Sequence, residues 1–118
     1  MIQFQLDPRL ENDTLAIGLL ELCELRLMND ARWPWLILVP RVPDAVEWHE
    51  LFADQRQDLD FEIAHIASAL KALTDCEKVN IASLGNMVRQ LHVHVIARNS
   101  GDRNWPGPVW GFGTKQAY

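Results

Sequence analysis

The chain has 118 residues, of which 48% are hydrophobic, and its formal net charge is -5 at pH 7. This length accommodates one compact domain, residues 1–118, and is too short for two ordinary ones. The acidic balance, without a lysine- or arginine-rich run, excludes a large sequence-independent surface for nucleic acid polymers. The chain contains no apolar stretch of about 18 residues and begins without the regions of a signal peptide, so we expect a cytoplasmic protein that does not contact a membrane.

The first part of the chain predicts a β-hairpin. Residues 1–20 have a mixed pattern that does not distinguish a short helix from a strand. Alternation over Cys23–Met28 predicts a strand, and the residues from Asn29 to Arg32 have the chemistry of a turn. The almost wholly apolar run from Trp35 to Val39, ended by Pro40, predicts a central strand buried on both faces.

Two helices are predicted next. Asp44 and Glu47 have the spacing of a capping box and predict a short helix that continues to about Phe52. Between Asp54 and Thr74, apolar residues recur at spacings of four and three and predict a long amphipathic helix. This apolar stripe consists of Leu59, Ile63, Ile66, Leu70 and Leu73.

The last part of the chain predicts two more strands and an ordered tail. Val79 to Ser83 favours a strand, and a loop follows at Leu84-Gly85-Asn86. A second strand is predicted from Met87 to Arg98. The tail from Asn99 is rich in glycine, proline and tryptophan and is predicted to form an ordered loop over a partner or a site.

Tryptophan and cysteine usage bears on assembly and redox state. Five tryptophans in so short a chain are expected to cover one another across a subunit boundary, which predicts a homodimer. Cys23 and Cys76 form no C-x-x-C motif, so they are expected to be reduced, small hydrophobic residues rather than a disulfide or half of a zinc site.

Two of the four histidines lie on the same face of the last predicted strand. Alternation places His92 and His94 on one exposed face and Leu91, Val93 and Val95 on the other. Neutral imidazole is a nucleophile, a proton carrier and a metal ligand, so the pair predicts a site beside the Gly/Asn loop. The alternatives are core histidines bonded to backbone carbonyls and an ordinary surface face.

Metal binding is a further alternative for the histidine pair. Gly85 followed by His92-x-His94 loosely resembles the first cupin motif, but Arg98 and its neighbours stand where that motif needs a glutamate. Two imidazoles alone lack the third protein ligand that a first-row metal usually has.

A closer resemblance covers a longer run. Gly85-Asn86-x3-Gln90-Leu91-His92-Val93-His94-Val95-Ile96-Ala97-Arg98 resembles the signature of the histidine triad (HIT) superfamily, with Gln90 in the place of the first histidine. The order of elements over roughly residues 20–105 also fits, and the segment from Arg98 to Gly111 resembles a bacterial HIT-like subgroup described as diadenosine tetraphosphate hydrolases. The resemblance implies an α+β fold: a HIT-like antiparallel sheet with one short and one long helix, assembled as a dimer.

The resemblance also implies hydrolysis of a nucleoside phosphoanhydride or phosphoramidate. His92 would attack the α-phosphorus and form a covalent nucleotidyl-imidazole that water then cleaves. The other ring nitrogen must be held as a donor, and a backbone carbonyl near Gln90 could hold it. His94 would contact the phosphate or help to move protons. No obligatory cofactor and no dedicated metal site are implied.

Five further residues are candidate polar contacts to the substrate. Asn86 would contact the phosphate or leaving group, the Gly85 backbone amide would stabilise negative charge, and Arg98 would attract phosphate. The alternatives are a turn asparagine and a solvent-facing arginine. The Asn29-Asp30 pair would accept hydrogen bonds from ribose, or is an ordinary turn. 

One tryptophan and two histidines outside the strand have further possible roles. Trp105 would stack on a base or close the site from a neighbouring subunit, or would anchor an interface. His49 and His65 are expected at the surface.

Three positions depart from the HIT pattern. Gln90 replaces the first histidine, Trp35 stands where many members have a further histidine, and Met87 stands where other branches have a hydroxyl residue. Gln90 can donate and accept hydrogen bonds, so it is expected to order the phosphate at the catalytic site, but it cannot carry a proton as imidazolium does. The alternative function is therefore a nucleotide-binding or sensing protein that has lost turnover, and a metal-dependent H-x-H protein is the third.

Overall fold

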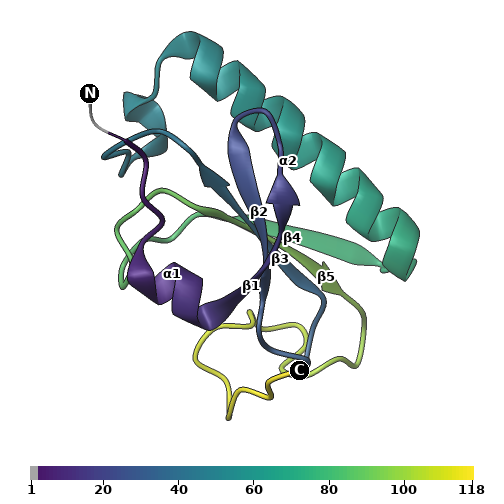
Figure 1. Ribbon diagram of the computed structural model, residues 1–118. Coiled ribbons are helices and arrows are strands. Elements are labelled where there is room, and N and C mark those ends of the chain that lie inside the picture. Colours follow the sequence, from purple (N-terminus) through teal and green to yellow (C-terminus); the bar gives the residue numbers. More distant parts are fainter. Residues whose placement is uncertain (1–2) are drawn as a thin grey trace.

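The computed structural model describes residues 3–118, and its centre is a five-stranded antiparallel sheet (Figure 1). The strands are β1 (Thr14–Leu19), β2 (Cys23–Met28), β3 (Trp35–Pro40), β4 (Lys78–Ala82) and β5 (Val93–Arg98). Their order across the sheet is β1-β2-β3-β5-β4. The α+β class with an antiparallel sheet is therefore confirmed.

The unassigned stretch, residues 1–20, contains a short helix and the first strand; its residues 1 and 2 lie outside the described part. Helix α1 (Pro8–Asp13) begins with proline, and the Asp7 carboxylate accepts a hydrogen bond from a backbone amide of the first turn (2.8 Å). Both features are common helix-start signals. Strand β1 has a bulge at residues 16–18. Thr14 is the one buried residue of this strand, so its apolar residues do not mark a buried face.

The predicted β2–β3 hairpin is confirmed. Its register pairs Cys23 with Pro40 and Leu27 with Leu36. Strand β3 lies between β2 and β5, so its neighbours use both of its edges. This central position accounts for its almost continuously apolar sequence.

The predicted short helix from Asp44 to about Phe52 is mostly wrong. Asp44 has a φ of 60°, in the left-handed region, whereas an N-cap residue is extended. Only a three-residue 3-10 turn, η1 (Trp48–Glu50), forms. The Leu91 amide donates to the Ala45 carbonyl (2.9 Å), so this long-range contact ties the segment to the chain before β5 and prevails over the local helix signal.

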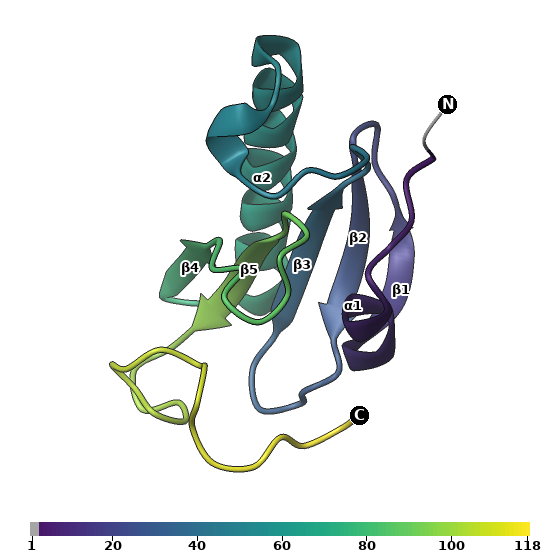
Figure 2. The same ribbon diagram turned by 90° about the vertical axis from the view of Figure 1, so that its left-hand side faces the viewer.

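The predicted long helix is confirmed as α2 (Ala53–Thr74), which ends at Asp75 in a left-handed conformation. Its buried residues are Leu59, Glu62, Ile66 and Leu70. Leu73 was predicted on the same stripe but is 86% exposed, because the apolar cluster beneath the helix ends at Leu70 and Cys76. Figures 1 and 2 show α2 on one side of the sheet and α1 on the other.

Strand β5 is shorter than predicted and separates two apolar clusters. It begins at Val93, and residues 83–92 form a loop rather than part of the strand. The α2-side cluster includes the β5 residues Val93, Val95 and Ala97. The tail-side cluster, on the other face, comprises Leu10, Trp33, Trp35, Ile37, Val39, Ile96 and Val109. The histidine face of β5 therefore meets aromatic rings.

The tail after β5 is ordered, as predicted, and packs on the tail-side cluster. Three tryptophans contact one another within the chain. Ring centroids are 6.2 Å apart for Trp33 and Trp35 and 5.8 Å apart for Trp35 and Trp110. Within residues 3–118, no helix has the length and apolar character needed to cross a membrane.

Candidate functional site

His92 lies immediately before β5, and one hydrogen bond orients its ring. Its Nδ1 lies 2.6 Å from the carbonyl oxygen of Gln90. A carbonyl only accepts, so Nδ1 carries the proton and Nε2 keeps its lone pair. The Ser83 hydroxyl donates to the His92 carbonyl (2.9 Å) and holds the backbone in place. The ring thus has the tautomer that a nucleophile requires.

His94 has the opposite arrangement. The indole N–H of Trp35 donates to its Nδ1 (2.9 Å). Burial, and then the nearby His92, lower the pKa of His94 to about 3, so the ring is neutral near pH 7. The Trp110 ring packs against it nearly at a right angle, at a centroid distance of 5.0 Å. His94 is therefore a neutral ring whose proton is on Nε2.

The two histidines are neighbours, as alternation predicted, but their face is not open to solvent. Their ring centroids are 4.9 Å apart. His92 is 6% exposed and His94 is 4% exposed, because the N-terminal segment and the tail pack over this face. The expectation of an exposed strand face is wrong for this reason.

The side chain of Gln90 binds the N-terminal segment. Its Oε1 accepts from the Asp7 amide and its Nε2 donates to the Gln5 carbonyl, both at 2.8 Å. This position was expected to order a phosphate. In the structure its amide group holds residues 5–7 against the loop before β5 instead.

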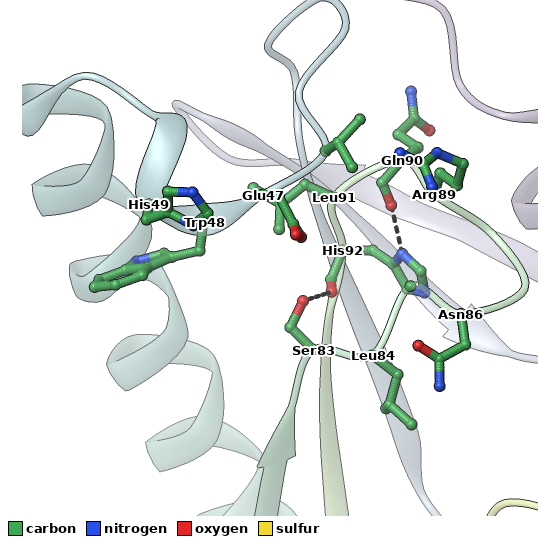
Figure 3. Close-up of a pocket in the computed structure, with 12 residues that line it drawn as sticks. Glu47, Trp48, His49, Ser83, Leu84, Asn86, Arg89, Gln90, Leu91 and His92 are labelled. Carbon is green, nitrogen blue, oxygen red and sulfur yellow. Dashed lines mark hydrogen bonds between the residues drawn. The ribbon is translucent and has the colours of Figure 1, made fainter.

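A cavity of about 490 Å³ lies beside His92 (Figure 3). Residues 46–49, 83–86 and 89–92 line it. In Figure 3 the His92 ring points toward Asn86 and away from Glu47 and His49. Local sequence patterns did not indicate that residues 46–49 lie at the site, because a long-range bond from the Leu91 amide to the Ala45 carbonyl ties this segment there.

Gly85 and Asn86 shape the loop beside His92. Gly85 has a φ of 76°, a left-handed conformation that glycine adopts without steric cost. Asn86 follows it, is exposed, and lines the cavity. The structure thus brings together the predicted residues Gly85, Asn86, Gln90 and His92, with His94 packed against His92.

Arg98 and Trp105 lie away from this cavity. Arg98 is 1% exposed, and its guanidinium donates twice to the Asp102 carboxylate, at 2.8 Å each, and once to the Gly107 carbonyl (2.9 Å). The hydrogen bond from Arg98 holds the pKa of Asp102 below its ordinary value. Trp105 covers the guanidinium at 5.6 Å. Both residues anchor the tail and are not brought to His92.

Asn29 and Asp30 lie in the β2–β3 turn beside the end of the tail. The Asn29 side chain accepts from the Tyr118 amide (2.9 Å). Burial opposes the charged form of Asp30, but hydrogen bonds from Arg32 and the Gln116 amide outweigh it and lower the pKa of Asp30. Asp30 lines a second hollow of about 380 Å³, whose walls include Trp35 and Trp110. Both rings also contact His94, so this hollow lies behind the histidine pair.

The described residues present no cluster suited to a metal ion. Within residues 3–118, no group of three or more histidine, cysteine, aspartate or glutamate side chains has a suitable arrangement. His92 and His94 therefore have no third ligand of these types beside them there. Cys23 and Cys76 are buried and unpaired.

Comparisons with known proteins agree on one family. Residues 9–101 match the family model described as HIT domain. The chain is similar to a histidine triad protein from Sinorhizobium meliloti, with 58% identity and a TM-score of 0.97, over 98% of this chain and 85% of that chain. A histidine triad protein from Bradyrhizobium japonicum is 50% identical, with a TM-score of 0.97, over 99% and 87% of the respective chains. One from Marinobacter aquaeolei is 48% identical, with a TM-score of 0.97, over 98% and 85%. Among curated proteins, none matches.

Proposed function

Because this chain belongs to the HIT domain family, whose members are generally nucleotide hydrolases or transferases, we propose that it hydrolyses a nucleotide through a covalent nucleotidyl-histidine at His92. The substrate is a nucleoside phosphoanhydride or phosphoramidate, and dinucleoside polyphosphates such as diadenosine tetraphosphate are the first to test. The observation that carries the proposal is the bond from His92 Nδ1 to the Gln90 carbonyl, which leaves Nε2 as a nucleophile beside a cavity.

The neighbouring groups fit the charges of such a reaction. Asn86 and the backbone at Gly85 line the cavity next to the ring and can donate to phosphate oxygens. The Nε2–H of His94 is a further donor on the same face. The hollow beside Asp30 is large enough to hold a sugar or base behind the histidines. Asn29 is bonded to the tail end and can act there only if the tail moves.

Mass spectrometry of protein quenched during incubation with diadenosine tetraphosphate tests the proposal. The wild type is expected to accumulate a nucleotidyl adduct and to release product, whereas His92→Ala should remain folded and form neither. His65→Gln is the matched control, because His65 lies on α2, stacked on Phe61. Turnover by a folded His92→Ala variant would contradict the mechanism.

A nucleotide-binding or sensing protein is the second candidate. It is favoured by the Gln90 amide, whose hydrogen bonds go to residues 5–7 instead of to a substrate. Tight binding of a dinucleoside polyphosphate with no adduct and no product would support this function.

A homodimer is the proposed assembly, with β4 at its interface. Ile81 on β4 is 50% exposed, and the adjacent loop exposes Leu84. Strand β4 pairs only with β5 among the described strands, over five successive residue pairs without a bulge. A regular edge strand with apolar side chains is suited to pairing with a second copy.

A further inference from the structure

The histidine pair also bears on which leaving groups the site can expel. Resting on the proposed function, we infer that the site acts on nucleotides whose leaving group departs as an anion. The Gln90 carbonyl fixes His92 in the tautomer of a nucleophile, and Trp35 fixes His94 in the tautomer of a hydrogen-bond donor. Neither histidine is then an acid that could protonate the leaving group. The substrate class is then phosphoanhydrides and esters of acidic alcohols, and phosphoramidates of basic amines are excluded.

Trp35 determines the state of His94. An indole N–H can only donate, so His94 Nδ1 must be the acceptor, and the single proton of the neutral ring is on Nε2. Protonating Nδ1 would place two N–H groups against each other at 2.9 Å. Burial of the ring opposes its charged form as well. His94 can thus donate a hydrogen bond to a phosphoryl oxygen but does not deliver a proton near neutral pH.

The other groups around His92 do not supply the missing proton either. Gln90 cannot carry a proton, and its amide is bonded to residues 5–7. The titratable groups that line the cavity are Glu47, His49 and Arg89. An arginine stays protonated throughout, and Glu47 and His49 lie on the side away from the His92 ring (Figure 3).

The bond changes show why the leaving group decides the outcome. The Nε2 lone pair of His92 forms a bond to the α-phosphorus, and the bond to the leaving atom breaks with its electron pair on that atom. A phosphate oxygen holds this pair without a proton, whereas an amine nitrogen must first be protonated. Water then bonds to phosphorus, the pair of the phosphorus–nitrogen bond returns to Nε2, and the proton of water passes to solvent.

The tautomers can be measured without any substrate, by NMR of protein labelled with 15N-histidine. At neutral pH, His94 is expected as the Nε2–H tautomer and His92 as the Nδ1–H tautomer. Trp35→Phe keeps an aromatic ring but removes the donor, so His94 should become a mixture of tautomers. Trp33→Phe is the matched control, because the indole of Trp33 donates to the Arg103 carbonyl (3.1 Å). An Nδ1–H or protonated His94 in the wild type overturns the inference, whether or not the variants fold.

The rate of adduct formation then tests the leaving group itself. Quenched-flow measurements compare diadenosine tetraphosphate with an adenosine phosphoramidate of an alkylamine. The phosphoramidate is expected to react at least about 100-fold more slowly, the usual minimum for a missing general acid. Similar rates would overturn the inference while leaving the proposed function intact, and His49→Gln and Glu47→Gln would then locate the acid. No adduct with either substrate would overturn the proposed function and this inference with it.

Discussion

At the scale of single residues, two side chains of the same type differ because their partners differ. His92 meets a carbonyl, which only accepts, and His94 meets an indole N–H, which only donates. The sequence identified both residues and placed them on one face. It could not assign their tautomers, because Trp35 is 59 positions from His94 in the chain and only the β3–β5 pairing brings the two together.

The buried His94 makes stability depend on pH. Its pKa of about 3 in the folded protein lies below the ordinary value of 6.5. Between these values the unfolded chain binds more protons, so the free energy of unfolding falls as the pH falls. From pH 7 to pH 5 this group should account for a loss of about 2 kcal/mol. Urea unfolding at pH 7 and pH 5 should show that the free energy of unfolding of His94→Gln falls by about 2 kcal/mol less than that of the wild type. An equal fall in the two proteins would contradict the low pKa of His94.

Glu62 is predicted to hold the β1–β2 turn against α2. It is 5% exposed, and its carboxylate accepts from the amides of Leu22 and Cys23, both at 2.8 Å. Glu62→Ala leaves two amides without an acceptor and should lower the free energy of unfolding by roughly 2–4 kcal/mol, measured by urea denaturation. Asp58→Ala, at an exposed position of the same helix, should change it by less than about 0.5 kcal/mol. Equal effects of the two variants would argue against this role.

At the scale of elements, long-range contacts corrected the local signals. The capping signal at Asp44 was outweighed by the bond between Leu91 and Ala45, and β1 was not recognised because Thr14 alone of its residues is buried. The predictions were correct for β2, β3 and α2. In these elements the local sequence pattern and the tertiary packing favour the same structure. Arg98 was misjudged because a terminal strand position resembles a surface site until the tail folds over it.

The tail is predicted to depend on the Arg98–Asp102 ion pair. Asp102→Asn removes one charge of a pair whose arginine is almost fully buried. Removing one partner of a buried pair leaves the other uncompensated, so the free energy of unfolding should fall by roughly 2–4 kcal/mol. Asp58→Asn provides the control, and tryptophan fluorescence during urea unfolding reports directly on the rings around Arg98. A loss no larger than that of the control would refute a structural role for the pair.

At the scale of the whole molecule, the two sheet edges are predicted to behave differently. Ile81 on β4 and Ile17 on β1 are 50% and 51% exposed, so they are matched in exposed apolar surface. The β1 edge is interrupted by its bulge, which disfavours pairing with another strand. Ile81→Asp should therefore convert the proposed dimer to monomer in sedimentation velocity, and Ile17→Asp should not. A wild type that sediments as a monomer would contradict the assembly.

What the sequence by itself determined is the family signature, the antiparallel α+β class, the central hairpin, the long helix and the identity of the histidine pair. The hairpin, the long helix and the shared face of the histidines follow from local periodicity and spacing, which need no knowledge of distant contacts. The signature and the antiparallel sheet follow from the resemblance to the histidine triad superfamily. Only the tertiary structure decided which histidine keeps a free lone pair on Nε2 and that the Gln90 side chain binds residues 5–7. It also decided that Arg98 pairs with Asp102 and that residues 46–49 line the cavity. Each of these depends on the donor or acceptor that folding brings from elsewhere in the chain, and such a partner leaves no trace in the local pattern.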